Sequence, residues 1–275
     1  MTIKNLGEIS FDEILDCFLL AFENYYVPMP TDSNYYQERW KASKVEFHFS
    51  YGMFDKGKLV GFILHSIDTR FGVLTAYNAG TGVIPAYRGN GIINSIYQEA
   101  LADMKQKGIE KSTLEVITTN HKAIRSYQNV GFKNCKTYKC YSGTIETKHI
   151  EPIEVEEIKL ENIQWNSLPN QQYYSWDHQK ESILGGSYSF FQVLNNKIPE
   201  SYFIIKPANG YVAQFDILKP ISGSWDRLFQ AIKSVSPTIK ILNVNERFSE
   251  KIKQISKNGL DHLLDQYEME LKIIS

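Results

Sequence analysis

The chain has 275 residues, of which 43% are hydrophobic and 13% aromatic, enough apolar material for one large globular domain or two smaller ones. Its 30 basic and 31 acidic residues nearly cancel, which excludes a whole-chain field that would attract nucleic acid or anionic lipid. We therefore expect no nucleic-acid partner, and any phosphate-bearing ligand must be held locally.

Membrane insertion, export and metal binding are not indicated either. The most apolar early run, residues 14–22, contains Asp16 and is far shorter than the ~20 residues that a membrane span requires. The first residues lack the basic and apolar regions of a secretory signal, so we expect a cytoplasmic protein without membrane association. Cys17, Cys135 and Cys140 lack the spacing of a zinc site, and no metal is expected.

The first half alternates helical and extended patterns. Apolar residues at helical spacing predict a helix over residues 11–24, and aromatic and β-branched runs predict hairpin strands over 46–53 and 59–66. The next predicted elements are a strand over 73–84, a Gly-rich turn, a helix that Gly108 ends, a strand over 113–117, a helix over 120–129 and a strand over 136–142.

The second half repeats this order of elements after an acidic, proline-containing stretch over residues 144–161. Its predicted elements are strands over 202–206 and 211–217, a helix with Trp225 and Phe229, a strand over 239–244, a helix ending near Lys257 and a last strand over 268–273. We therefore predict two domains, 1–147 and 148–275, that are diverged copies of one plan.

The turn Tyr87-Arg88-Gly89-Asn90-Gly91-Ile92-Ile93 carries the strongest chemical signal. It lies between a predicted strand and a predicted helix, where glycines let backbone amides approach a ligand and the helix N-terminus adds partial positive charge. Such a turn suits a phosphate, with Arg88 beside it, although the same residues also fit an ordinary tight connection. A dinucleotide-binding fingerprint is discounted, because the preceding strands form hairpins rather than a βαβ unit.

Two motifs resemble those of the GCN5-related N-acetyltransferase (GNAT) family. The family's central motif, (Gln or Arg)-x-x-Gly-x-(Gly or Ala), follows a strand ending Val-x-Pro, and Val83-Ile-Pro leads here to Arg88 and Gly91, with Ile93 where the pattern has Gly or Ala. The second signature, Asn-x-x-Ala followed by Tyr and Gly-Phe, is matched by Asn120-His121-Lys122-Ala123, Tyr127 and Gly131-Phe132. The resemblance covers roughly residues 1–145, and residues 76–83 are similar to a subgroup with two such domains in tandem.

The resemblance implies an α/β (α+β) GNAT fold, with a mixed, mostly antiparallel sheet flanked by helices, and acetyl-CoA as co-substrate. Val83 would offer backbone hydrogen bonds to the pantetheine arm, and Asn120 would contact the cofactor, although Asn120 fits a plain helix N-cap equally well. The residues implied at the pyrophosphate are Arg88, Gly89, Asn90, Gly91, Ile92, Ile93 and Asn94.

Tyr127 is the candidate general acid. It lies seven residues after Asn120, about two helical turns, and therefore on the same helix face. An ordinary tyrosine, with a pKa near ~10, is protonated at neutral pH and can donate to the departing CoA thiolate. A half-buried core tyrosine is the alternative interpretation. The general base stays unassigned among Asp68, His48, His65 and a chain of waters.

The second half lacks both motifs. Residues 218–224 contain one glycine and no Arg-x-x-Gly, and Ile255 stands four residues before Gly259, where Tyr127 precedes Gly131. We expect a degenerate, non-catalytic copy. Its aromatic residues either wall the acceptor pocket or form core: Tyr173, Tyr174, Trp176 and Phe190.

The leading hypothesis is an N-acetyltransferase that transfers an acetyl group to a primary amine by direct attack in a ternary complex. The acceptor would be a small-molecule or peptide amine, and the chain a monomer or homodimer. An acyl-CoA-binding sensor or scaffold without turnover is the alternative; it would bind the cofactor and release no thiol. A protein-interaction module would have no need of the glycine turn.

Overall fold

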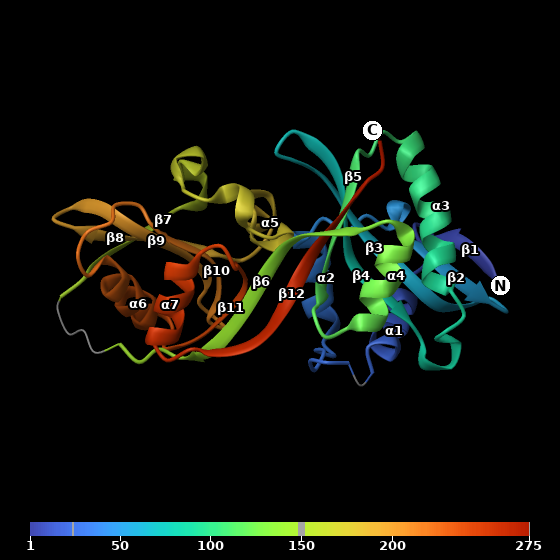
Figure 1. Ribbon diagram of the computed structural model, residues 1–275, viewed down its shortest axis with the longest axis horizontal. Helices are drawn as coiled ribbons and strands as arrows, with labels where there is room; N and C mark the ends of the chain where they lie inside the picture. Colours follow the sequence, from blue (N-terminus) through green and yellow to red (C-terminus); the bar gives the residue numbers. More distant parts are fainter. Residues whose placement is uncertain (24, 148–151, 275) are drawn as a thin grey trace. The chain divides into compact units, whose positions relative to one another are not determined.

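The chain folds into two compact units. A computed structural model describes residues 1–23, 25–147 and 152–274 (Figure 1). The first unit comprises Met1–Cys135 together with Glu268–Ser275, and the second comprises Lys136–Tyr267. The predicted domain boundary after residue 147 falls at residues 148–151, which lie outside the described residues, and it stays a prediction.

The first unit is a sheet with strand order β1-β2-β3-β4-β5-β12-β6. Its strands are β1 (Thr2–Asn5), β2 (Tyr51–Asp55), β3 (Lys58–Arg70), β4 (Val73–Val83), β5 (Lys111–Ile117) and the unit's portions of β6 (Lys133–Thr144) and β12 (Asp261–Lys272). Its helices are α1 (Phe11–Ala21), α2 (Ser33–Ala42), α3 (Ile92–Gln106), α4 (His121–Val130) and the 3₁₀ turns η1 (Phe47–Phe49) and η2 (Pro85–Tyr87). The pairs β1–β2, β2–β3 and β3–β4 are antiparallel, and the pair β4–β5 is parallel.

Helices cover both faces of this sheet. A Cβ atom on Gly82 would lie 2.7 Å from Ala21, and one on Gly80 would lie 3.1 Å from Phe18, so the two glycines let α1 pack closely on β4. On the opposite face α3 buries an apolar stripe with the residues Ile92, Ile96, Tyr97, Ala100 and Met104. The region around the end of β4 therefore lies between α1 on one side and α3 on the other.

The second unit has the matching strand order β7-β8-β9-β10-β11-β6-β12. Its own strands are β7 (Glu154–Ile158), β8 (Ser189–Asn195), β9 (Ile198–Lys206), β10 (Tyr211–Ile217) and β11 (Thr238–Asn245). Its helices are α5 (Lys180–Leu184), α6 (Ser224–Val235), α7 (Ser249–Lys257) and the 3₁₀ turns η3 (Leu160–Asn162), η4 (Trp165–Ser167), η5 (Gln171–Tyr173) and η6 (Trp176–His178). The prediction that both halves follow one plan is thus confirmed at the level of strand order.

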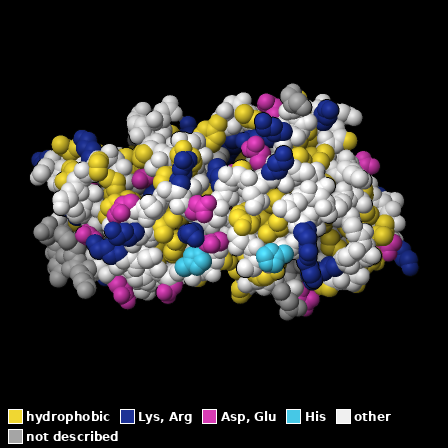
Figure 2. Space-filling view, in the orientation of Figure 1, with side chains coloured by type: hydrophobic (Ala, Val, Ile, Leu, Met, Phe, Trp, Pro, Cys, Tyr) yellow, Lys and Arg dark blue, Asp and Glu magenta, His cyan; other side chains and the backbone are white. Residues whose placement is uncertain are grey.

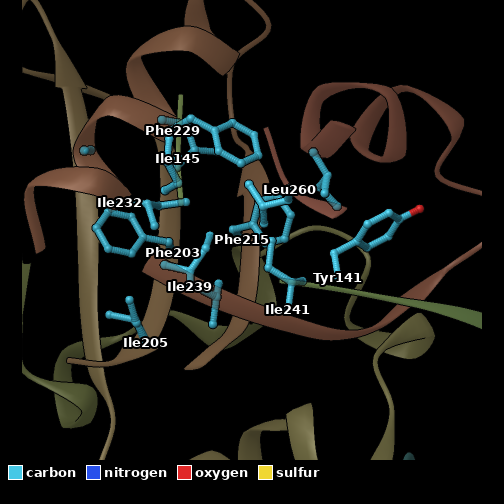
Figure 3. Packing of buried hydrophobic residues seen from close by; sticks show 14 of the residues in the cluster. Tyr141, Ile145, Phe203, Ile205, Phe215, Phe229, Ile232, Ile239, Ile241 and Leu260 are labelled. Atoms are coloured by element: carbon cyan, nitrogen blue, oxygen red, sulfur yellow. The ribbon is translucent and has the colours of Figure 1, made fainter. Parts of the chain in front are cut away.

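Apolar side chains from β9, β10, β11 and α6 fill the core of the second unit (Figure 3). Phe203, Phe215 and Phe229 are each 2% exposed or less. Three of the four aromatic residues with an undecided role are also buried, namely Tyr174, Trp176 and Phe190. Within this unit these three therefore belong to the core.

Strands β6 and β12 each begin in one unit and end in the other. In the first unit the backbone N–H of Ile273 donates to the Glu110 carbonyl at 2.8 Å, and Lys111 pairs with Glu270 at 3.1 Å. The end of β12 thus completes the sheet of the first unit beside β5. This strand follows the whole second unit in sequence.

Element boundaries differ from the predictions in several places. The strand predicted from residue 46 begins at Tyr51, because residues 47–49 form the turn η1, which the Ser50 hydroxyl fixes by donating to the Glu46 carbonyl at 2.8 Å. Helix α2 was not predicted, since it buries only Tyr36 and Trp40 and has a weak apolar stripe. Helix α1 ends at Ala21, and position 24, its predicted end, lies outside the described residues.

Charge and hydropathy add little further constraint on function. Basic and acidic side chains are interspersed over the face of the molecule in Figure 2. Among the helices of the described residues, none is long and apolar enough to cross a membrane.

Candidate active site

Strands β4 and β5 separate at the centre of the first unit. They pair in parallel only over residues 75–78 of β4, the last pair being Asn78 with Leu114, although β4 continues to Val83 and β5 to Ile117. The register of β4 against β3 shifts at Ala79, which is a β-bulge. Beyond the bulge, no strand of the described residues pairs with the β5-facing edge of β4, where the Val83 carbonyl accepts from Arg88.

The backbone groups on this edge belong to Thr81 and Val83. The Ile84 N–H donates to the Val60 carbonyl of β3 at 3.0 Å. Because backbone groups alternate in direction along an antiparallel strand, those of Thr81 and Val83 point away from β3, toward the gap. The sequence-predicted Val83 therefore presents its N–H where an extended amide-bearing ligand could pair with it.

The glycine turn leads from this edge into α3. Gly89 and Gly91 have φ angles of +84° and +70°, a conformation that favours glycine. No described atom beyond the neighbouring residues lies within 4 Å of a Cβ built on either glycine, so the space above the turn is open. Two side-chain hydrogen bonds fix the turn. The Asn90 side-chain amide donates to the Tyr87 carbonyl at 3.1 Å, and the Tyr87 hydroxyl donates to Asp55 at 2.8 Å.

The N-terminus of α3 faces the same open space. Gly91 caps the helix without a side-chain hydrogen bond, and the Gly91 carbonyl accepts from Ser95 at 3.1 Å. The backbone N–H groups of the preceding residues, Ile92, Ile93 and Asn94, have no acceptor within the helix by its geometry. Amides and the positive end of the helix dipole thus converge here, as anion binding requires.

Arg88 has a different environment from the one that its sequence position suggests. Its Nε donates to the Val83 carbonyl at 3.1 Å and its Nη2 donates to the Ala21 carbonyl at 3.0 Å. The guanidinium therefore braces the end of β4 against the end of α1.

Tyr127 projects from α4 to the end of β4. Its side chain is 8% exposed, and its ring meets that of Tyr97 edge-on at 6.3 Å between centroids. Burial raises the pKa of Tyr127 to about 12, while hydrogen bonds from Thr81 and Asn78 act in the opposite direction. The phenol is therefore protonated at neutral pH.

Asn120 holds the start of α4 and contacts a residue that the sequence analysis missed. Its Oδ1 accepts from the Ala123 N–H at 3.2 Å, so the N-cap interpretation is confirmed. Burial raises the pKa of Tyr25, and the Asn120 side chain lowers it. Tyr25 in turn raises the pKa of Tyr127, so both phenols lie in one electrostatic environment.

Two of the candidate bases are engaged elsewhere. Asp68 forms ion pairs with Lys44 at 2.8 Å and with Arg70 at 3.1 Å. His48 is an exposed residue of η1. Neither lies among the residues that surround Tyr127.

His65 is fully buried on β3, opposite Asn78 of β4. Its Nδ1 lies 2.9 Å from the Phe49 carbonyl, and its ring lies 6.2 Å from that of Tyr97. Burial lowers the pKa of His65 to about 4, so the imidazole is neutral at pH 7. The general base stays unassigned.

The second unit has a comparable turn that is closed by an ion pair. Helix α6 also begins after a glycine with positive φ, Gly223 at +78°. A Cβ on Gly223 would lie 2.9 Å from Nη1 of Arg227, whose guanidinium pairs with the fully buried Glu200 at 2.6 and 2.8 Å. The guanidinium of Arg227, paired with the carboxylate of Glu200, thus occupies the space next to the N-terminus of α6.

The matching strand edge in the second unit is satisfied internally. The Leu218 N–H donates to the Glu200 carbonyl at 2.7 Å, as Ile84 does to Val60, so Phe215 and Ile217 correspond to Thr81 and Val83. The Phe215 carbonyl accepts from Lys251 Nζ at 2.7 Å and from the Tyr174 hydroxyl at 3.3 Å. The Ile217 N–H donates to Asp216 at 3.1 Å, and Asp216 also pairs with Lys251 at 3.0 Å.

Comparisons with known proteins agree with this geometry. Residues 12–132 match the acetyltransferase (GNAT) family. The chain is 30% identical over 105 residues to N-alpha-acetyltransferase 30 of Schizosaccharomyces pombe, covering 37% of this chain and 70% of that protein. It is 35% identical over 83 residues to N-alpha-acetyltransferase MAK3 of Arabidopsis thaliana, covering 30% of this chain and 44% of that one.

Solved structures match both units together. A tandem GNAT protein from the clavulanic acid biosynthesis pathway superposes with a TM-score of 0.69 at 11% identity, covering 100% of this chain and 99% of that one. A putative acetyltransferase from Pyrococcus horikoshii gives a TM-score of 0.69 at 15% identity, covering 98% and 89%. The chain belongs to the GNAT family and has the tandem GNAT fold. It is an N-acetyltransferase, of a family that uses acetyl-CoA as co-substrate and acts on amines.

Proposed function

We propose that the first unit binds acetyl-CoA at the end of β4 and transfers the acetyl group directly to the N-terminal amine of a peptide. One observation carries this proposal: the unpaired edge of β4, the open N-terminus of α3 and the buried phenol of Tyr127 meet at one place. The choice of a peptide amine is supported by the names of the two N-alpha-acetyltransferases to which the first unit is similar.

The cofactor would follow the backbone of the first unit. The pantetheine arm would pair with the N–H of Val83 along the unpaired edge, and the pyrophosphate would accept hydrogen bonds from the amides of residues 89–94. We assign Arg88 to holding the turn in place, because its guanidinium already binds two carbonyls. Asn120, on the other side of the gap, would contact the cofactor while capping α4.

The chemical step needs one proton donor from the protein. The amine nitrogen attacks the thioester carbonyl carbon, the new C–N bond forms, and the C–S bond breaks with the electron pair on sulfur. The Tyr127 hydroxyl gives its proton to the thiolate, the ammonium that results from attack loses a proton to water, and the Tyr127 phenolate takes a proton back from water. The second unit would bind no acetyl-CoA, because Lys251 and Arg227 occupy the matching positions.

A thiol-release assay with acetyl-CoA tests the proposal. Peptides with an unmodified N-terminus are compared with the same peptides after N-terminal blocking, and with polyamines and other small amines. We expect thiol release and one added acetyl group, located by mass spectrometry, only with the unblocked peptides. Cofactor binding without thiol release on any amine would support the sensor or scaffold instead, and release with small amines alone would overturn the peptide assignment.

A further inference from the structure

Four polar side chains form a buried network behind the proposed reaction site. Asn78 Nδ2 donates to the Tyr97 hydroxyl at 2.6 Å and to the Thr81 hydroxyl at 2.6 Å. The Thr81 hydroxyl lies 2.9 Å from Asn78 Oδ1, and both side chains lower the pKa of Tyr127, whose ring lies 6.3 Å from that of Tyr97. Tyr97, Asn78 and Tyr127 are each at most 8% exposed.

The bulge in β4 makes this network possible. Successive side chains of a regular strand alternate between faces, so Asn78 and Thr81, three positions apart, would point to opposite faces. Because Ala79 is an extra residue in β4, Asn78 and Thr81 point to the same face of the sheet, the face that α3 and α4 cover. Asn78 Oδ1 also accepts from the Gly80 N–H at 3.1 Å, which fixes the amide across the bulge.

The second unit shows what the fold alone requires at these positions. Its bulge falls at Ala213, after the last β10–β11 pair at Val212, so Val212 corresponds to Asn78 and Phe215 to Thr81. Counted from the glycine before each helix, Phe229 of α6 corresponds to Tyr97, and Ile255 is the seventh residue of α7 as Tyr127 is of α4.

All four counterparts are apolar members of one buried cluster, and two of them, Phe215 and Phe229, are seen in Figure 3. The same plan therefore packs well without a single polar group at these positions. Keeping four in the first unit costs desolvation, which indicates a purpose other than stability.

We propose that Asn78 and Thr81 are positioning residues for the proton donor, holding the Tyr127 hydroxyl toward the gap between β4 and β5 and stabilising the phenolate left after proton transfer. This inference rests on the proposed function. It adds two residues to the reaction that neither family motif contains.

A buried proton donor needs hydrogen bonds from its neighbours because proton transfer leaves a charge on it. When Tyr127 gives its proton to the thiolate, the O–H bond breaks and a buried oxygen carries the negative charge, which its surroundings disfavour. The Thr81 hydroxyl can rotate from Asn78 Oδ1 to donate to the phenolate, and the Asn78 amide holds Thr81 in place by donating to its oxygen. Hydrogen bonds to a charged oxygen are stronger than those to a neutral one, so these contacts gain strength as the charge develops.

The test replaces Thr81 with its near-isostere valine. We expect Thr81→Val to lower kcat by ~10-fold to 100-fold, as is typical for one lost hydrogen bond to a developing charge, with an unchanged dissociation constant for acetyl-CoA. Thr81→Ser keeps the hydroxyl and should retain most of the rate. The matched control is Thr75→Val, because Thr75 is a buried threonine of the same strand whose hydroxyl bonds only locally, to the Val73 carbonyl at 3.0 Å.

A double-mutant cycle separates this role from a structural one. If Thr81 acts through the Tyr127 hydroxyl, Thr81→Val should change kcat by less than ~3-fold in a Tyr127→Phe background. An equal loss in both backgrounds, or a full rate in Thr81→Val while the wild-type enzyme turns over, would overturn the inference and leave the proposed function standing. Absence of thiol release by the wild-type protein would overturn both.

Discussion

The two units build the same strand edge and helix N-terminus and treat them in opposite ways. In the first unit the edge of β4 beyond Ala79 faces a gap, and the space above Gly91 is open. In the second unit the corresponding groups are bound by Lys251 and Asp216 on the strand, and Arg227 lies above the helix. The first unit binds only the Val83 carbonyl of this edge with a side chain among the described residues, that of Arg88, whereas the second unit binds groups of both residues, Phe215 and Ile217.

This difference separates features that both units share from features found in the first unit alone. A bulge in the fourth strand and a glycine before the following helix occur in both units, so they are properties of the plan. The phenol of Tyr127 on α4, where α7 has Ile255, and the open space at Gly91, where Arg227 lies beside Gly223, distinguish the first unit. Substitutions at matched positions in the two units therefore separate effects on chemistry from effects on folding.

The largest expected effect is on the reaction rate of Tyr127→Phe. Removing one hydroxyl and keeping the ring should lower kcat by ~10² to 10⁴-fold, the usual contribution of a general acid, with little change in acetyl-CoA affinity. Tyr51→Phe is the control, because Tyr51 is a buried tyrosine of the same unit whose hydroxyl bonds Asp103. A Tyr127→Phe variant with full rate and a lowered melting temperature would show that this tyrosine is only a core residue.

Arg227→Ala should produce the largest loss of stability. The substitution leaves the carboxylate of Glu200 buried without its cation, which typically costs ~3–5 kcal/mol of unfolding free energy. Arg88→Ala, at the matching turn, leaves no buried charge without a partner and should lower the unfolding free energy by only ~1 kcal/mol. Urea titration measures both, and calorimetry should give one acetyl-CoA per chain for the wild type and for Arg227→Ala. A second equivalent in the variant would mean that the ion pair alone blocks a competent site.

Acidification should destabilise both units through one buried histidine in each. Burial lowers the pKa values of His65 and His178 to about 4, from an unfolded value of 6.5. Between these values the unfolded chain binds a proton that the native protein does not, so stability falls as the pH drops from 6.5 to 4, by up to ~3 kcal/mol per histidine.

Denaturant titration over this pH range measures the effect. His65→Gln and His178→Gln should each flatten the decline in unfolding free energy relative to the wild type. A decline that stays as steep in both variants would assign the acid sensitivity to carboxylates instead.

The smallest effect and the most direct comparison come from Gly91→Val and Gly223→Val. Both place a β-branched residue at positive φ, so both should lose stability by a similar backbone strain. Only Gly91→Val fills the open space of the first unit, and its acetyl-CoA dissociation constant should rise by ~10-fold or more, while that of Gly223→Val stays unchanged. Equal affinities in the two variants, measured by calorimetry on folded protein, would contradict the phosphate site.

The sequence predicts the parts of the site that lie close together along the chain. The turn from Arg88 to Gly91 and the cap at Asn120 are local patterns with a local physical meaning, and they fall where expected. The position of Tyr127 follows from helical spacing within the same short segment. The repeated order of elements along the chain was also accessible, because the hydrophobic period survives in both halves.

Residues brought together by tertiary packing could not be found in this way. Tyr25 meets Asn120 across the unit, and nothing in the segment after the first helix distinguishes it from the neighbouring Tyr26. Asn78 and Thr81 share a face only because of a bulge, which leaves no mark in the hydrophobic pattern. The opposite case is Arg88, whose motif suggested a phosphate contact and whose guanidinium binds backbone carbonyls.

Because of the position of β12, the first unit can be completed only at the end of protein synthesis. The part of β12 that lies beside β5 is translated only after every residue of the second unit has been added to the chain. Until then β5 presents an open row of N–H and C=O groups, the kind of edge that recruits strands from other chains. The first unit is therefore the first to be made and the last to be finished, and nascent chains that stall before residue 268 should be the ones that depend most on chaperones.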